Sequence, residues 1–203
     1  KVKKIGYDPK LFTSSTLERY FGYKFQLIPI KQNFIDSFFL EKKNKINNFF
    51  IIGDNIVGET VKSKINRLRQ ILIKKRINNI FVSAPENVAW LLNIRGNDNP
   101  NSPIPNCRLI MDKYKNIYLF SDLKKISKIQ KKIKYRKIRF LDFNKFYDVL
   151  SKLNNKNIII DKLTCSIYYE SLINSKFIIK GYEDPIYYLK SIKNKVEIEN
   201  MKY

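Results

Sequence analysis

The chain of 203 residues is long enough for one domain with a real core, alone or with pieces of neighbouring domains. Its hydrophobic fraction of 44% and aromatic fraction of 14% exclude a disordered chain. The net charge of +22 suggests nucleic acid or an anionic membrane as a partner.

The residues that accompany this charge offer a simpler explanation for it. The chain contains 32 lysines, 31 isoleucines and 22 asparagines, three residue types that share A/T-rich codons. A nucleic-acid binder has no reason to accumulate isoleucine, and only 8 residues are arginine, the preferred partner of phosphate and guanine. We therefore attribute most of the charge to base composition and expect no specific nucleic acid partner.

Several classes of chemistry lack the residues they need. The absence of histidine excludes Ser-His-Asp and Cys-His triads and histidine-containing zinc sites. Cys107 and Cys165 do not make a disulfide framework and favour a reducing, cytoplasmic setting.

No apolar run approaches the roughly 18 residues of a membrane span. The basic start at Lys1 leads into no apolar segment, so we expect no signal peptide, and a first residue other than Met indicates a piece of a longer protein.

Hydrophobic patterning predicts a strand, a helix, a second strand and a short helical turn in the N-terminal part. Gly22 ends the helix and Pro29 closes the second strand. The polar stretch 42–48 has no pattern and reads as a linker and candidate domain boundary. The predicted elements lie at 2–7, 16–21, 25–28 and 34–40.

After this linker, strands and helices alternate again. One helix has its apolar residues at Val61, Ile65, Leu68 and Leu72, which define one face. Strands are predicted at 49–52, 80–82, 108–112, 117–120, 138–143, 158–161 and 177–179. Helices are predicted at 60–77, 85–95, 122–132, 144–153, 163–174, 185–190 and 193–203. Because one antiparallel hairpin at 108–120 interrupts the alternation, we predict an α/β fold: a mixed, mostly parallel sheet flanked by helices on both faces.

The most distinctive segment runs from 83 to 98, through a helix into an Arg-Gly-x-Asp turn. Trp90 lies on the apolar side of the helix and should pack on the sheet. Arg95 suits a bidentate bond to a carboxylate, and Asp98 is the nearby candidate. This pair either only fixes the loop or takes a direct part in binding, and the sequence leaves both readings open.

This segment resembles the middle domain of three-domain Xaa-Pro aminopeptidases, where the stretch reads S-A-L-D-E-I-A-W-L-L-N-L-R-G-S-D. Four further stretches agree in order and spacing, so the resemblance covers almost the whole chain. Asn87, Asn97 and the loop 99–104 depart from the family pattern. The matching residues are Ser83, Ala84, Ala89, Trp90, Leu91, Leu92, Asn93, Arg95, Gly96 and Asp98, with 5–9, 27–36, 58–69 and 190–203.

The resemblance implies a creatinase/prolidase N-terminal fold and a place within a longer enzyme. Residues 1–40 would be the C-terminal part of a first such domain, 45–190 the whole second domain, and 191–203 the start of a pita-bread catalytic domain. That domain would hold two divalent metals, usually manganese, whereas this chain would contain no cofactor, metal ligand or catalytic residue. Its structural or substrate-proximal loop would comprise Trp90, Asn93, Arg95, Gly96 and Asp98.

The function that the resemblance implies is that of a noncatalytic region of a cytoplasmic Xaa-Pro aminopeptidase. The parent enzyme would remove the N-terminal residue of peptides with proline at the second position. The expected partners are the protein's own catalytic domain and such peptides, with no membrane, and a homodimer is left open. Two alternatives stay open: a stand-alone peptide- or protein-binding module of the same fold, and nonspecific nucleic-acid binding.

Overall fold

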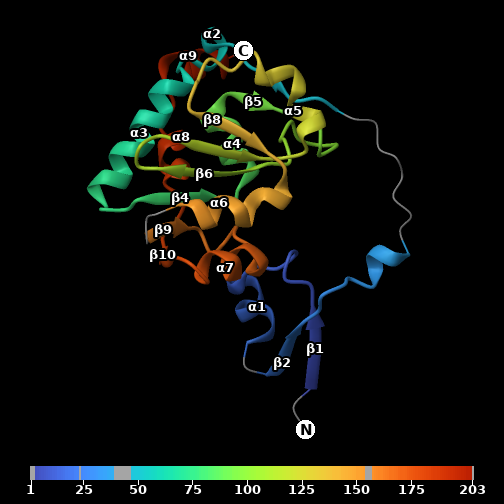
Figure 1. The fold of residues 1–203 in the computed structure, drawn as a ribbon. Helices are drawn as coiled ribbons and strands as arrows, with labels where there is room; N and C mark the ends of the chain where they lie inside the picture. The colour runs from blue at the N-terminus through green and yellow to red at the C-terminus, as the bar shows by residue number, and fades with distance from the viewer. Residues whose placement is uncertain (1–2, 23, 39–46, 154–156, 203) are drawn as a thin grey trace.

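The centre of the molecule is a six-stranded mixed sheet, seen in a computed structural model that describes residues 3–22, 24–38, 47–153 and 157–202 (Figure 1). The strand order is β10-β9-β4-β6-β7-β8. The pairs β10–β9, β9–β4 and β7–β8 are parallel, whereas β4–β6 and β6–β7 are antiparallel. The strands are β4 (Asn79–Val82), β6 (Arg108–Asp112), β7 (Ile117–Phe120), β8 (Ile138–Leu141), β9 (Asn157–Ile160) and β10 (Ile178–Gly181).

Helices cover both faces of this sheet, because successive strand residues point into two different apolar cores. In β4, Ile80 and Val82 belong to one core, whereas Phe81 belongs to the other. The fold class expected from the sequence is therefore confirmed. The first core includes α3 (Val61–Lys74), α4 (Pro85–Leu92), α5 (Leu123–Gln130) and α8 (Pro185–Ser191), and the second includes α6 (Phe146–Lys152) and α7 (Ile167–Asn174).

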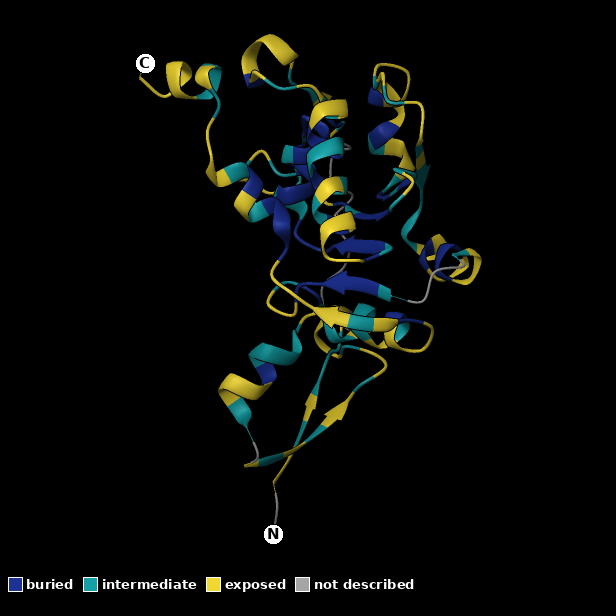
Figure 2. Cartoon of the chain, turned by 90° about the vertical axis from the view of Figure 1, so that its left-hand side faces the viewer, coloured by how far each residue is buried: buried dark blue, intermediate teal, exposed yellow. Residues whose placement is uncertain are grey.

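A second, two-stranded parallel sheet lies at the N-terminal end, where β1 (Lys3–Tyr7) pairs with β2 (Phe25–Pro29) and α1 (Ser14–Phe21) connects them. A main-chain bond of 2.9 Å from the Ile167 N–H to the Phe12 carbonyl attaches this part to the start of α7. Figure 2 shows exposed and half-buried residues in this small sheet but buried residues in the middle of the large one.

The C-terminal segment lies at the opposite end of the molecule from the N-terminus (Figure 1). There α9 (Lys195–Asn200) packs against α2 (Asp54–Val57), and the Asn194 Nδ2 group donates to the Val57 carbonyl at 2.8 Å. Asn194 and Glu197 also form a capping box that fixes the start of α9. The remaining elements are the 3₁₀ turns Ile35–Ser37 and Phe143–Lys145 and the two-residue strands β3 (Phe50–Ile51) and β5 (Ile94–Arg95).

The structure differs from the predicted elements at places where a single residue determines the end of a helix or strand. The helix predicted to run to 95 ends at Leu92, because Asn93 adopts a left-handed conformation with φ 53°. Ile94 and Arg95 then leave as β5, which pairs with β3. A short helix, α2, occupies the predicted turn between glycines 53 and 58. The predicted linker 42–48 and the end of the helical turn 34–40 lie largely outside the described residues.

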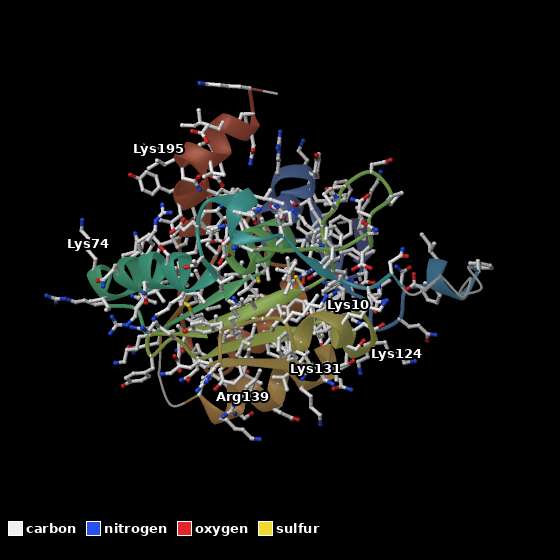
Figure 3. All side chains as sticks on the ribbon, turned by 90° about the horizontal axis from the view of Figure 1, so that it is seen from above. Lys10, Lys74, Lys124, Lys131, Arg139 and Lys195 are labelled. Atoms are coloured by element: carbon white, nitrogen blue, oxygen red, sulfur yellow. The ribbon has the colours of Figure 1, made fainter. Side chains whose placement is uncertain are left out.

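Positive side chains are distributed around the molecule. Figure 3 labels six exposed basic residues: Lys124 and Lys131 belong to α5 and its C-terminal end, and Lys10, Lys74, Arg139 and Lys195 come from four other segments. In α5, within the densest basic run, Ile126 and Ile129 are buried while Lys124 and Lys128 are exposed, which describes a solvated helix face. In the part of the chain that the structure describes, no helix is long and apolar enough to cross a membrane.

The first core predicts a large difference between two identical substitutions in α3. Ile65 is 0% exposed, whereas Ile73 on the same helix is 45% exposed. Ile65→Ala should lower the free energy of unfolding by about 2–5 kcal/mol through lost burial and a cavity. Ile73→Ala should cost less than about 1 kcal/mol. Urea unfolding of both variants measures the difference, and equal losses would contradict the packing of α3 described above.

Candidate functional site

The segment singled out from the sequence begins where β4 ends and passes through α4. Pro85 occupies the first turn of α4, and Glu86 lies near its positive end. The helix ends at Asn93, whose N–H bonds back to the carbonyls of α4. A residue in this left-handed conformation turns the chain sharply, and Asn tolerates it better than most residues. Asn93 therefore lies at a point where α4, β5 and the start of α3 meet.

A buried lysine that sequence reasoning missed lies beneath this turn. Lys64 is 1% exposed, and its Nζ donates to the Trp90 carbonyl at 3.0 Å and to Asn93 Oδ1 at 2.7 Å. The ammonium also lies 4.2 Å from the centroid of the Trp90 ring. Burial lowers the pKa of Lys64 to about 8, against the opposing effect of the carboxylates of Glu59 and Glu197.

Trp90 and Asn93 both contribute to this buried cluster. Trp90 is partly buried and packs against the first core, as the sequence predicts, while its ring faces the lysine. The Asn93 carboxamide is 1% exposed; its Oδ1 accepts from Lys64, and its Nδ2 donates to the Glu59 carbonyl at 2.9 Å and to Asp54 Oδ1 at 3.3 Å. One buried side chain thus ties the end of α4 to α2 and to the segment before α3.

The predicted pair between Arg95 and Asp98 is wrong, because the structure gives each residue other partners. The Arg95 guanidinium turns back to α4 and donates to the carbonyls of Ile94 at 2.8 Å and Ala89 at 3.3 Å. The Asp98 carboxylate forms an ion pair with Lys125 of α5 and accepts from the Asn106 N–H at 2.6 Å. Arg95 is thus bonded to the end of α4, and Asp98 to α5 and to the later part of the loop, so each residue fixes a different end of the loop.

Gly96 occupies a position with no room for a side chain. A Cβ atom there would lie 2.9 Å from the Phe49 ring and 2.9 Å from the Pro105 Cα. Phe49 is 2% exposed and belongs to the first core, so neither neighbour can withdraw easily. The Gly96 N–H donates to the Pro103 carbonyl at 3.1 Å, which closes the loop after β5.

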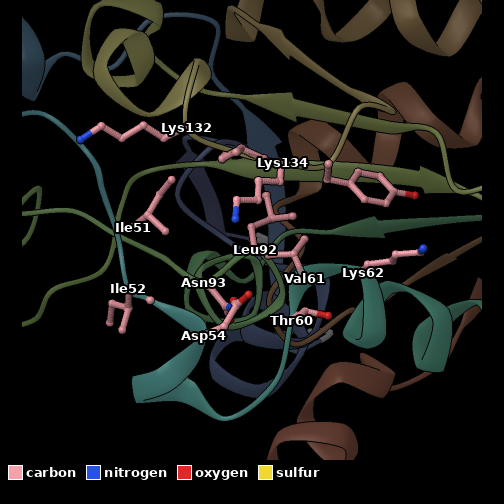
Figure 4. Close-up of a pocket in the computed structure, with 13 residues that line it drawn as sticks. Ile51, Ile52, Asp54, Thr60, Val61, Lys62, Leu92, Asn93, Lys132 and Lys134 are labelled. Atoms are coloured by element: carbon pink, nitrogen blue, oxygen red, sulfur yellow. The ribbon is translucent and has the colours of Figure 1, made fainter.

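Asn93 also forms part of the wall of a cavity of about 390 Å³ (Figure 4). This volume is within the range of about 300–1,000 Å³ typical of small-molecule sites. The lining combines isoleucine, valine and leucine side chains with a few polar groups. The lining residues come from four segments: 51–54, 60–62, 92–93 and 132–135.

The side chains around the cavity provide means of binding. They offer apolar surface, lysine ammonium groups and one carboxylate, that of Asp54. The described residues hold no group of three or more Cys, Asp or Glu that could ligate a metal ion. Both cysteines are free and buried elsewhere; burial raises the pKa of Cys165 to about 12 and also that of Cys107, which disfavours a thiolate nucleophile.

Comparison with known proteins identifies the class of domain that this fold defines. The family model described as the Creatinase/Prolidase N-terminal domain matches residues 41–197. The chain therefore belongs to the creatinase/prolidase N-terminal domain family, and the resemblance found from its motifs is confirmed.

Its relatives place the domain more specifically. A probable Xaa-Pro aminopeptidase P from Fusarium vanettenii is 34% identical over 110 residues, which are 50% of this chain and 18% of the relative. Xaa-Pro aminopeptidase 1 from Dictyostelium discoideum is 28% identical over 158 residues, which are 77% of this chain and 25% of the relative. The chain thus spans about a quarter or less of these relatives.

A solved structure extends the likeness of the fold to the whole chain. The crystal structure of X-prolyl aminopeptidase from Caenorhabditis elegans, described as a cytosolic enzyme with a di-nuclear active site, matches with a TM-score of 0.79 at 22% identity. The match covers 100% of this chain and 35% of that chain. At this identity the likeness concerns the fold, which includes the small N-terminal sheet.

The buried lysine predicts a specific pH dependence of stability. Because the pKa of Lys64 is about 8 in the folded chain and 10.5 as its ordinary value, the unfolded chain binds more protons between these values. Folded stability therefore rises with pH in this window, by up to about 1.4 kcal/mol per pH unit. Lys64→Met should lack this rise, so its stability should fall further behind wild type from pH 8 to 10.5.

Urea unfolding at several pH values measures the effect. Lys62→Met is the matched control, because Lys62 is an exposed lysine of the same helix. The difference between Lys62→Met and wild type should stay constant across the window. A constant difference for Lys64→Met as well would contradict the lowered pKa of Lys64 in the folded chain.

The close contacts of Gly96 predict a steric cost. Gly96→Ala should lower the free energy of unfolding by about 1–3 kcal/mol, because the new methyl group overlaps Phe49 and the backbone of Pro105. Gly181→Ala in β10 is the control, since a Cβ there meets only the flexible Lys162 side chain at 3.5 Å. Thermal unfolding of both variants tests this, and equal stability of the two would contradict the tight contact at Gly96.

Proposed function

We propose that the chain is the noncatalytic N-terminal region of a metal-dependent Xaa-Pro aminopeptidase. The parent enzyme removes the N-terminal residue of peptides that carry proline at the second position. The proposal rests on the similarity of this chain to proteins that are themselves named Xaa-Pro aminopeptidases. The match of the family model over residues 41–197 agrees with that similarity.

The proposal divides the chain into three parts. Residues 1–40 form the C-terminal part of a first creatinase N-terminal-like domain, 45–190 form the second such domain, and 191–203 begin the catalytic domain. The separate two-stranded sheet at the N-terminal end supports the first division, because β1 and β2 pair with each other and not with the six-stranded sheet. The capping box at the start of α9 supports a helix that begins a new segment.

In this arrangement the catalytic chemistry lies outside residues 1–203. By the family resemblance, the catalytic domain would hold two divalent metals, usually manganese, which would supply an activated water for hydrolysis of the Xaa-Pro bond. The segment described here forms a wall beside that domain and limits access of long peptides. Its Trp90, Asn93, Arg95, Gly96 and Asp98 fix the loop that follows α4. The enzyme acts in the cytoplasm, as is stated of the related Caenorhabditis elegans enzyme.

The decisive experiment isolates the native polypeptide from its source cells with an antibody raised against this chain. A species of several hundred residues should cleave a peptide with proline second and leave the matched peptide with alanine second intact. Chelation should abolish cleavage, and added Mn²⁺ should restore it. The 203-residue chain alone should be inactive in the same assay.

A different outcome would favour the other class of function. A native species near 24 kDa without metal-dependent cleavage would overturn the proposal and leave a stand-alone binding module. A large species that cleaves both peptides equally would retain a peptidase but contradict the preference for proline.

A further inference from the structure

The cavity beside Asn93 carries opposite charges on its wall, and nothing in the proposed peptidase function uses it. We infer that it binds a small zwitterion with an apolar body, the chemistry of a free aliphatic amino acid or of a short apolar dipeptide. Binding concerns residues within this chain, so it does not depend on the peptidase activity.

Lys134 supplies the positive group. In Figure 4 its side chain extends towards the other lining residues, whereas those of Lys62 and Lys132 extend away. None of these three lysines forms an ion pair with a residue in the described ranges. The Lys134 ammonium is therefore available for a carboxylate that enters the cavity.

Asp54 supplies the negative group, at the start of α2. Its Oδ1 accepts from Asn93 Nδ2 at 3.3 Å, and Asn93 is itself held by its bond to the buried Lys64. The carboxylate thus has a defined position at the polar side of the cavity, near Thr60 (Figure 4). Among the described residues no basic side chain forms an ion pair with Asp54. An ammonium group on the ligand would form an ion pair with the Asp54 carboxylate.

The wall between these charges is apolar. Ile51, Val61 and Leu92 line it together with Ile133 and the partly buried Tyr135. A ligand with an aliphatic side chain would bury apolar surface there, which favours binding. The volume of about 390 Å³ accommodates a single amino acid and also a small dipeptide. A phosphate or another simple anion uses neither Asp54 nor the apolar wall.

The test is an NMR titration of the ¹⁵N-labelled 203-residue chain with L-leucine and, separately, with L-leucyl-L-leucine. Saturable shifts should appear at the amides of Asp54, Val61, Asn93 and Lys134 for at least one of the two, and the tighter one identifies the size of ligand. Isoamylamine lacks the carboxylate and 4-methylpentanoate lacks the ammonium group. Each should bind about two- to fivefold more weakly, as expected for the loss of one solvent-exposed ion pair.

Variants assign the two charges. Lys134→Met and Asp54→Asn should each weaken binding about two- to fivefold. Lys132→Met is the matched control, because this lysine extends away from the cavity, and it should leave binding unchanged. The backbone spectra of all three variants should stay native, since the three side chains lie on the exposed surface.

Three results would overturn the inference. The first is the absence of saturable shifts at the cavity up to about 50 mM of either ligand, a limit well above millimolar affinity. The second is an equal loss of affinity in Lys132→Met and Lys134→Met, which would indicate general attraction to a basic chain. The third is binding of 4-methylpentanoate as tight as that of L-leucine, which would show that Asp54 does not pair with the ammonium group of the ligand.

Discussion

The buried ammonium of Lys64 constrains how α3 and α4 pack against each other. A charged group away from water is costly unless hydrogen bonds and an aromatic face replace its hydration. Trp90 supplies its carbonyl and its ring, and Asn93 supplies its amide oxygen. These partners come from the end of α4, so α3 and α4 can pack only in a geometry that satisfies the lysine. The left-handed turn at Asn93 is needed in that geometry, because it leads the chain from α4 into β5.

The sequence predicts most of the large sheet because burial there leaves a plain pattern. Ile80, Phe81 and Val82 form an apolar run, as expected for a strand covered on both faces, and they divide between the two cores. The helix α3 follows from its stripe at Ile65 and Leu68 in the same way. In both cases the signal is local, because hydrophobic residues recur with the period of the element.

The site is harder to predict because its contacts join distant segments. Lys64 lies between Val61 and Leu68 in helical spacing, within the apolar stripe, and this position is the one signal of its burial. Because lysine is usually exposed, the residue type at position 64 predicts an exposed side chain even though the position lies within the apolar stripe. The Arg95–Asp98 pairing fails for a related reason: three residues of irregular loop do not set the direction of two long side chains. Residues 132–135, about forty residues beyond Asn93, form part of the cavity wall. No local sequence pattern predicts that they lie beside Asn93.

The short helix α2 connects the cavity to the C-terminal segment. Its first residue, Asp54, lies in the cavity wall, while the carbonyls of Ile56 and Val57 near its end accept bonds of 2.8 Å from Asn200 and Asn194. Gly58 keeps this contact close, because a Cβ there would lie 2.3 Å from the Asn194 side chain. The four residues of α2 thus join two regions that are distant in sequence: its first residue lies in the cavity wall, and the carbonyls near its end hold α9 and its N-cap.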